Sequence, residues 1–73
     1  MQNLKPGMIV SLVDYDRILW DTVDSSTIIC RIPVKEAFLI LSLRHPIHCR
    51  VKALFKNKVG YLHLPNDCKI IHQ

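Results

Sequence analysis

Glycine is nearly absent from this chain of 73 residues, which contains only Gly7 and Gly60. Two glycines cannot build the glycine-rich loops that cradle phosphates in nucleotide-binding enzymes. Long apolar runs are lacking too, because the longest, residues 37–41, is far short of the about 20 residues that cross a bilayer. The opening, MQNLKPGMIV, has Pro-Gly where a signal peptide needs its apolar stretch. These absences predict a soluble, cytoplasmic protein with no membrane segment.

Cysteine is too sparse and too widely spaced for a disulfide framework. The three cysteines are Cys30, Cys49 and Cys68, an odd number. We expect free thiols that pack as small hydrophobic side chains. We expect no metal site, because neighbouring His48 and Cys49 would point to opposite faces of a strand and no Cys-x-x-Cys or His-x-x-x-His pair is present.

Acidic residues are few, and most of them crowd into one segment. The chain has six Asp and Glu against ten Lys and Arg, which gives a net charge of +4. Four of the six acids lie between residues 14 and 24, and eight of the ten cations lie from residue 31 onward. This crowding leaves no positioned pair of base and nucleophile, so we expect neither an enzyme nor a bound cofactor. The pattern describes an acidic loop on a basic domain.

The length predicts a single domain over residues 1–73. A chain this short buries only about 60% of its unfolded surface, so its core is marginal. The hydrophobic fraction of 49% is nevertheless typical of a folded protein. Self-association would be a natural supplement to so small a core.

The clearest structural signal is a β-hairpin over residues 47–64, with a two-residue turn at Asn57-Lys58. Side chains on a strand alternate between two faces, so a single register assigns both faces of the hairpin. This register places Phe55 opposite Gly60. The inward face would carry Cys49, Val51, Ala53, Phe55, Leu62 and Leu64. The outward face would carry Arg50, Lys52, Leu54, Lys56, Tyr61 and His63, with Lys58 at the turn.

Four further segments have the pattern of strands, and they are residues 8–13, 28–34, 37–44 and 69–72. Pro33 cannot donate to a ladder, so the second segment is an edge strand or the return arm of a long hairpin loop. A helix over residues 35–44 is the alternative for the third. Residues 14–26 are polar and predict an irregular segment, and residues 65–67 predict a tight 3₁₀ turn.

The order of these segments resembles the SH3-like barrel family, including bacterial SH3 and KOW-type barrels. The run Lys5-Pro6-Gly7-Met8-Ile9-Val10 resembles the opening of such barrels, and Gly60-Tyr61-Leu62 with Pro65-Asn66 resembles the ending of peptide-binding SH3 domains. The resemblance implies an all-β, five-stranded barrel with a long RT-type loop over residues 14–36, an n-Src loop at His45-Pro46 and a 3₁₀ turn before the last strand. Asp67 stands where the family has the tyrosine of its proline-peptide groove. The fold therefore carries over without that ligand.

Two surfaces predict two kinds of partner. On the basic face of the hairpin, cations would track phosphates and Tyr61 would stack a base, so this face predicts non-specific binding of nucleic acid. The nucleic-acid candidates are Arg50, Lys52, Lys56, Lys58, Tyr61 and His63. The alternative is a solvated strand face without a ligand. The acidic loop, with Tyr15, Trp20 and Asp21, would instead take a protein partner, unless Trp20 closes one end of the barrel.

Residues 37–44 are apolar on both faces, and one barrel interior covers only one of them. We expect Phe38 and Ile40 to lie on the other face, covered by the long loop, by a partner or by a second copy of the chain. The hypothesis is a small non-catalytic binding or adaptor module that acts through protein–protein contacts and self-associates. The alternative is a non-specific nucleic-acid-binding barrel. A lone barrel of this kind is similar to small accessory proteins of phages and bacteria.

Overall fold

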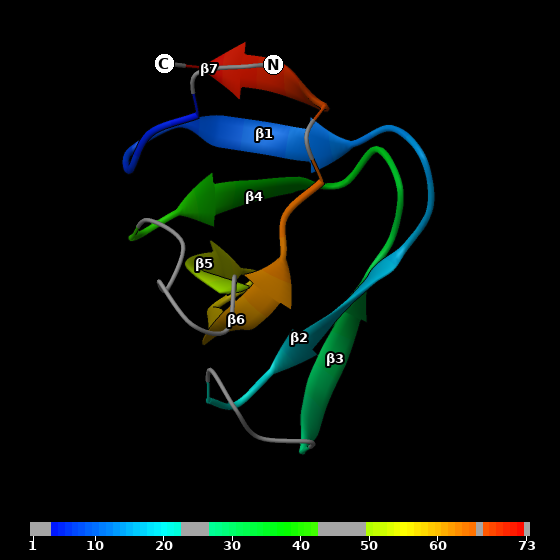
Figure 1. Cartoon of the computed structure of the whole chain (residues 1–73), viewed down its shortest axis with the longest axis vertical. Helices are drawn as coiled ribbons and strands as arrows, with labels where there is room; N and C mark the ends of the chain where they lie inside the picture. Colours follow the sequence, from blue (N-terminus) through cyan, green and yellow to red (C-terminus); the bar gives the residue numbers. More distant parts are fainter. Residues whose placement is uncertain (1–3, 23–26, 43–49, 66, 73) are drawn as a thin grey trace.

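Every regular element in the described part of the chain is a β-strand. A computed structural model describes residues 4–22, 27–42, 50–65 and 67–72. The strands are β1 (Ile9–Leu12), β2 (Arg17–Trp20), β3 (Ile28–Ile32), β4 (Ala37–Ile40), β5 (Arg50–Phe55), β6 (Lys58–His63) and β7 (Cys68–His72). They form one antiparallel sheet in the order β3-β2-β6-β5-β4-β1-β7, with β3 and β7 at its edges (Figure 1). The prediction of an all-β protein is confirmed, but the strands number seven and not five.

The sheet curls so that one of its faces surrounds a single hydrophobic core. Figure 1 shows β1, β4 and β7 on one side of the molecule, β2 and β3 on the other, and β5 and β6 between them. Each strand contributes at least one buried side chain to the core. One from each, in chain order, is Val10, Leu19, Ile32, Ile40, Val51, Leu62 and Cys68. Because every strand supplies part of one core, the domain should unfold as a unit.

The hairpin of β5 and β6 has the two faces that the sequence predicts. The predicted inward residues that the structure describes are all buried: Val51, Ala53, Phe55, Leu62 and Leu64. Lys56 and His63 are exposed, while Lys52 is half-buried. Cys49, which was expected on the inward face, lies outside the described residues.

The turn of this hairpin differs from the prediction by one position. Lys56 and Asn57 both have positive φ, 48° and 66°, as the two central residues of a type I′ turn require. Gly60 therefore lies opposite Ala53, and the predicted pairing of Gly60 with Phe55 is wrong. When the turn moves by one residue, the partner of each residue on the opposite strand changes by two positions. The faces are unchanged because side chains alternate with period 2.

The structure reverses the predicted faces of β4. Residues 37–40 form a strand, so the helical alternative over residues 35–44 is wrong there. Phe38 and Ile40 are buried, with 2% and 1% of their surface exposed, while Leu39 is half-buried and Leu41 is exposed. The expectation that Phe38 and Ile40 form an exposed partner-binding patch is therefore wrong. Apolar side chains on both faces gave no sign of which face would point inward.

One of the two additional strands, β2, comes from the segment that was expected to be irregular. β2 lies within residues 14–26 and pairs with β3, which is the predicted edge strand and ends just before Pro33. The predicted final strand is confirmed as β7, and the first as β1. The predicted break at His45-Pro46 lies outside the described residues, and so does residue 66 of the predicted 3₁₀ turn. Within the described chain, no helix is long and apolar enough to cross a membrane.

Gly60 lies where β6 packs most closely on β2. A Cβ atom added at Gly60 would lie 2.5 Å from the carbonyl oxygen of Trp20 and 2.6 Å from Cγ of Leu19. Both atoms belong to β2, and one of them is backbone, so neither can move aside easily. Only glycine fits at this position.

We expect Gly60→Ala to lower the free energy of unfolding by roughly 1–3 kcal/mol, because the methyl group overpacks the contact with β2. The measurement is chemical denaturation of the purified protein. Val59→Ala, at the neighbouring position where the side chain is 46% exposed, is the control and should change stability far less. Equal stability of the two variants would contradict the close approach at Gly60.

Candidate binding face

One row of side chains crosses the sheet on the side away from the core. Trp20 of β2 lies opposite Tyr61 of β6, and Tyr61 lies opposite Lys52 of β5. Residues directly opposite each other in antiparallel strands point to the same face. The surface that they define on β2, β5 and β6 is called the outer face. It carries Ile18, Trp20, Arg50, Lys52, Leu54, Val59, Tyr61 and His63.

The row continues beyond these three strands with apolar side chains. Trp20 lies opposite Ile28 of β3, and the backbone N–H of Leu41 donates a 2.8 Å hydrogen bond to the carbonyl oxygen of Lys52. Ile28 is 57% exposed and Leu41 is 37% exposed. Exposed apolar side chains beside aromatic ones on a sheet face are typical of an interaction surface.

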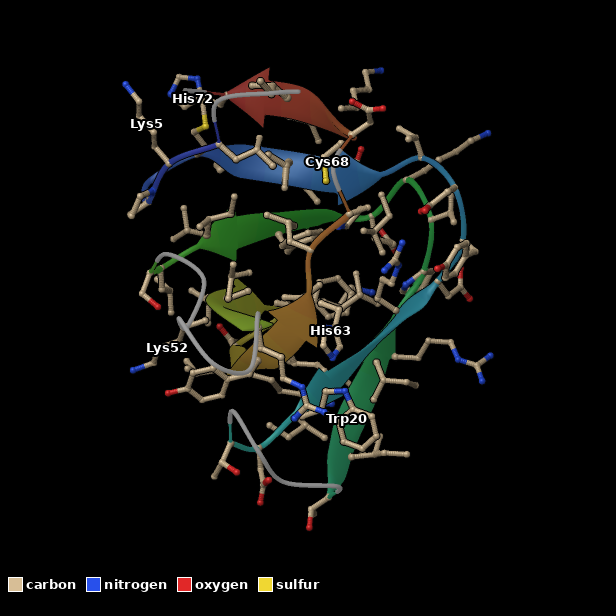
Figure 2. The ribbon with its side chains drawn as sticks, in the orientation of Figure 1. Lys5, Trp20, Lys52, His63, Cys68 and His72 are labelled. Carbon is tan, nitrogen blue, oxygen red and sulfur yellow. The ribbon has the colours of Figure 1, made fainter. Side chains whose placement is uncertain are left out.

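Arg50 joins β5 to the end of β2. Its guanidinium lies 4.8 Å from the centroid of the Trp20 ring, and its Nη1 donates a 3.1 Å hydrogen bond to the carbonyl oxygen of Thr22. Its Nε lies 3.4 Å from Nε2 of His63, the residue opposite it on β6. Figure 2 shows Trp20 in the lower part of the molecule, His63 near its middle and Lys52 at the left. The cation therefore holds the indole on the outer face.

Trp20 does not fold over the hydrophobic core. Its side chain is half-buried on the outer face, and the neighbouring Leu19 enters the core with none of its surface exposed. The alternative of Trp20 as a plug is therefore wrong. Since strand residues alternate, the core position of Leu19 places Trp20 outside.

The predicted nucleic-acid candidates separate into two groups. Arg50, Lys52, Tyr61 and His63 share the outer face. Lys56 is in the turn instead, where its Nζ lies 3.4 Å from Oε1 of Glu36 and 5.4 Å from the centroid of the Phe55 ring. Lys58 lies opposite Phe55, whose side chain is in the core, and so it belongs to the other side of the sheet. The expected basic stripe along the hairpin is therefore interrupted.

The carboxylates of the acidic loop bind groups of the protein itself. Asp14 accepts hydrogen bonds of 2.7 Å from Nη2 of Arg17 and from the backbone N–H of Tyr15. Asp16 accepts a 2.9 Å hydrogen bond from the backbone N–H of Val34. Both carboxylates therefore stabilise the loop, which makes them poor candidates for binding a basic ligand. Asp21, which the sequence predicts to contact a protein partner, is exposed.

Arg17 is the residue of this region that the sequence did not single out. Its guanidinium lies 4.1 Å from the centroid of the Tyr15 ring, and its Nη1 donates a 3.3 Å hydrogen bond to the carbonyl oxygen of His63. With the Asp14 ion pair, these contacts fasten the loop to the end of β6. Tyr15, Trp20 and His63 thus share one open pocket of about 330 Å³ with Arg17. Recognising residues 17–20 as a strand would have identified this group.

No group of three His, Cys, Asp or Glu side chains is placed to hold a metal ion within the described ranges. Cys30 and Cys68 are free thiols. Burial raises the pKa of Cys68 to about 11, which keeps its thiol protonated at neutral pH and makes it a poor nucleophile.

Comparison of the chain with protein-family models, with curated proteins and with solved structures finds no match. Its function is therefore argued from the geometry of the outer face and of its surroundings.

The contacts of Asp14 make one contribution to stability depend on pH. The backbone N–H of Tyr15 and the side chain of Arg17 lower the pKa of Asp14 below its ordinary value of 3.8. A lowered pKa means that the ionised carboxylate stabilises the fold above pH 3.8, and that this contribution is lost as the pH falls through the folded-state pKa. We expect Asp14→Asn to melt at a lower temperature than the wild type near neutral pH, and the difference to shrink in acid.

The measurement is thermal melting by circular dichroism, from neutral pH down to below pH 3.8. Asp21→Asn removes the same charge from the neighbouring segment and serves as the control. A difference between Asp14→Asn and wild type that stays constant down to the lowest accessible pH would contradict the role of the ionised carboxylate.

Proposed function

We propose that this chain is a non-catalytic binding module of the SH3-like class, which docks a segment of a partner protein on its outer face. The observation that carries the proposal is the row from Leu41 through Lys52, Tyr61 and Trp20 to Ile28. It combines exposed apolar side chains, two aromatic rings and a cation on one side of the sheet. This composition suits a protein interface, where aromatic residues and arginine are enriched.

The order of the strands supports the SH3-like part of the proposal. Five strands are neighbours in the order β7-β1-β4-β5-β6. The consecutive strands β4, β5 and β6 form a meander, and β1 and β7 extend it on one side, as in a five-stranded SH3-like barrel. The remaining hairpin, β2 and β3, occupies residues 14–36, where the resemblance implies the RT-type loop. The extra two strands would then be the arms of that loop.

The charges of the outer face favour an acidic partner segment. Arg50 and Lys52 are half-buried cations there, and the exposed Arg31 lies opposite Ile18 at the margin of the face. No residue that defines the outer face carries a carboxylate. A partner segment with Asp or Glu among apolar residues would therefore complement both the charge and the hydrophobic surface.

Self-association through the same face is less well supported. A two-fold dimer brings the same patch of both copies together, so Lys52 and Arg50 would approach their own counterparts. Like charges placed together in an interface cost free energy. One of the two reasons to expect a dimer, besides the small core, was an uncovered Phe38 and Ile40, and both are buried in the single chain.

Single-stranded nucleic acid is the second candidate. It is favoured by Trp20, Tyr61 and Lys52 in one row, because aromatic rings beside cations stack bases and neutralise phosphates. It is opposed by Arg50, which covers one face of the Trp20 ring, and by the interrupted basic stripe.

The test is selection from a random library of short peptides on the immobilised protein. We expect the selected peptides to combine Asp or Glu with aliphatic or aromatic residues, and Lys52→Glu to weaken their binding about tenfold or more because it reverses a charge inside the interface. Lys5→Glu makes the same charge change at an exposed position away from the outer face and should bind them normally.

Two results would overturn the proposal. One is a set of selected peptides without acidic residues, and the other is unchanged affinity of Lys52→Glu. A parallel salt titration with a short single-stranded oligonucleotide tests the second candidate, since each phosphate contact makes binding weaken with salt. Oligonucleotide binding that Lys52→Glu abolishes, without peptide selection, would replace the protein partner by nucleic acid.

A further inference from the structure

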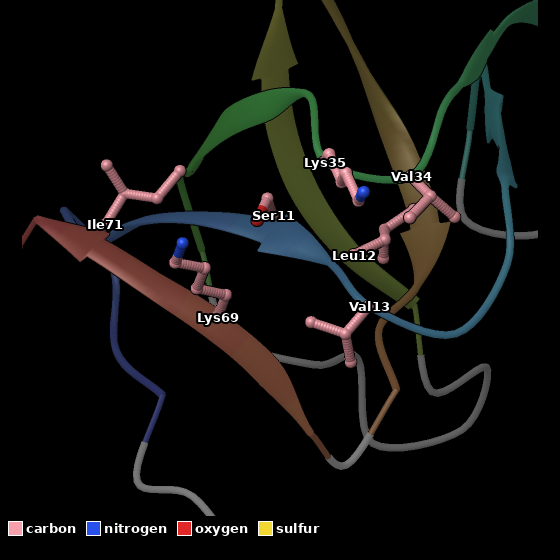
Figure 3. Close-up of a pocket in the computed structure, with 7 residues that line it drawn as sticks. All are labelled: Ser11, Leu12, Val13, Val34, Lys35, Lys69 and Ile71. Carbon is pink, nitrogen blue, oxygen red and sulfur yellow. The ribbon is translucent and has the colours of Figure 1, made fainter.

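A second recessed surface lies on β1 and β7, outside the residues that define the outer face. It is a pocket of about 290 Å³ between β1, β7 and the turn that joins β3 to β4 (Figure 3). The residues that carry the argument are Ser11, Val13, Val34, Lys35, Lys69 and Ile71. Its volume is just below the about 300–1,000 Å³ typical of ligand sites, so it suits a small ligand.

The walls of this pocket are apolar and exposed to solvent. Val13 is 54% exposed and Ile71 is 49% exposed, and Val34 is half-buried beside them. At the floor lies Ser11, which is only 3% exposed and is the buried polar residue among the described side chains. An apolar pocket with a polar group at its base can hold an apolar chain and orient its polar end.

Two lysines lie on either side of Ser11. Lys69 is directly opposite Ser11 in the pairing of β7 with β1, and Lys35 is in the turn between β3 and β4. Figure 3 shows their side chains on the two sides of Ser11. Neither lysine forms an ion pair with any residue in the described ranges, and no carboxylate lines the pocket. The two ammonium groups are therefore available to an anion.

The backbone holds Lys35 in a conformation that favours glycine. Its φ is 75°, its N–H donates a 3.1 Å hydrogen bond to the carbonyl oxygen of Leu12, and the N–H of Glu36 closes the turn on the carbonyl oxygen of Pro33 at 3.3 Å. A positive φ at this turn position is normally occupied by glycine or asparagine. Residues in such strained conformations cluster at binding sites.

We propose that this pocket binds a small amphipathic carboxylate. The apolar chain of the ligand lies against Val13, Val34 and Ile71, and its carboxylate accepts charge-assisted hydrogen bonds from the ammonium groups of Lys35 and Lys69. Burial of the chain supplies hydrophobic free energy, and the two cations select an anionic end. The site does not rest on the proposed function, because none of its residues belongs to the outer face.

The experiment is a titration of isotope-labelled protein with octanoate, followed by amide chemical shifts. We expect saturable shifts centred on Val13, Val34 and Ile71. Octanol has the same chain without the charge, and octylamine has the opposite charge. Octanol should bind about tenfold more weakly, because its neutral hydroxyl lacks the negative charge that strengthens hydrogen bonds from both lysines, and octylamine should not bind, because its ammonium group repels them.

The deciding variant is Lys35→Gly, which removes an ammonium group and relieves the positive φ at once. It should fold at least as stably as wild type and bind octanoate about tenfold more weakly. Lys56→Gly is the matched control, because Lys56 is also a lysine at positive φ, in the turn between β5 and β6. It loses the same charge outside the pocket and should bind octanoate like the wild type.

If Lys35 has a structural role instead, Lys35→Gly should melt at a lower temperature than the wild type. That result would contradict the proposal. Lys69→Met provides an independent test from β7 and should also weaken binding. The proposal is overturned if octanol binds as well as octanoate, if Lys35→Gly binds like Lys56→Gly, or if octanoate produces no saturable shifts at the pocket.

Discussion

The close approach of β6 to β2 at Gly60 is the contact on which the rest of the domain depends. The hairpin of β2 and β3 joins the remaining strands through β6, and the registered pair in that junction is Trp20 with Tyr61. A side chain at Gly60 would separate the two strands, since backbone and core atoms of β2 occupy its space. Separation would open the core on the side of Leu19. It would also part Trp20 from Tyr61 on the outer face. Fold and binding surface therefore share one steric constraint.

Two arginines reinforce the same junction at its two ends. Arg50 connects β5 to Trp20 and to the chain just after β2, while Arg17 connects the loop before β2 to the last carbonyl group of β6. Such contacts between cations, rings and carbonyl oxygens stabilise the fold only modestly at a partly exposed surface. Their larger effect is on position, because Arg50 lies against the Trp20 ring and Arg17 against the Tyr15 ring. A surface that is ordered before binding loses less conformational entropy when a partner docks.

The sequence predicts the parts of this fold that depend on strict alternation, and it fails where alternation is ambiguous. The faces of β5 and β6 were predictable because one register places Val51, Ala53, Phe55, Leu62 and Leu64 on one face and Lys52 and His63 on the other. The exact turn was not, since neither Lys56-Asn57 nor Asn57-Lys58 contains the glycine that would identify it. β4 is apolar on both faces, so only the curl of the sheet decides that Phe38 points inward. β2 was missed because its short apolar run is flanked by aspartates that resemble a loop. The pocket beside Lys35 has no signature in the sequence, because it depends on a positive φ that lysine rarely adopts.

One hydrogen bond connects the proposed carboxylate site to the open pocket that borders the outer face. Asp16 lines the open pocket beside Trp20, and its carboxylate accepts the backbone N–H of Val34, which lines the pocket of the proposed carboxylate site. A ligand that moved Val34 would act directly on the loop that carries Tyr15. Thermodynamic linkage requires any such effect to be reciprocal, so a partner that moved the loop would change the affinity for the carboxylate by the same factor. The bond lies at the surface and is a single contact, so the coupling it transmits is limited to the free energy of one charge-assisted hydrogen bond, about 1.5–3 kcal/mol at most. Each ligand can therefore bind without the other, and each changes the affinity for the other only modestly.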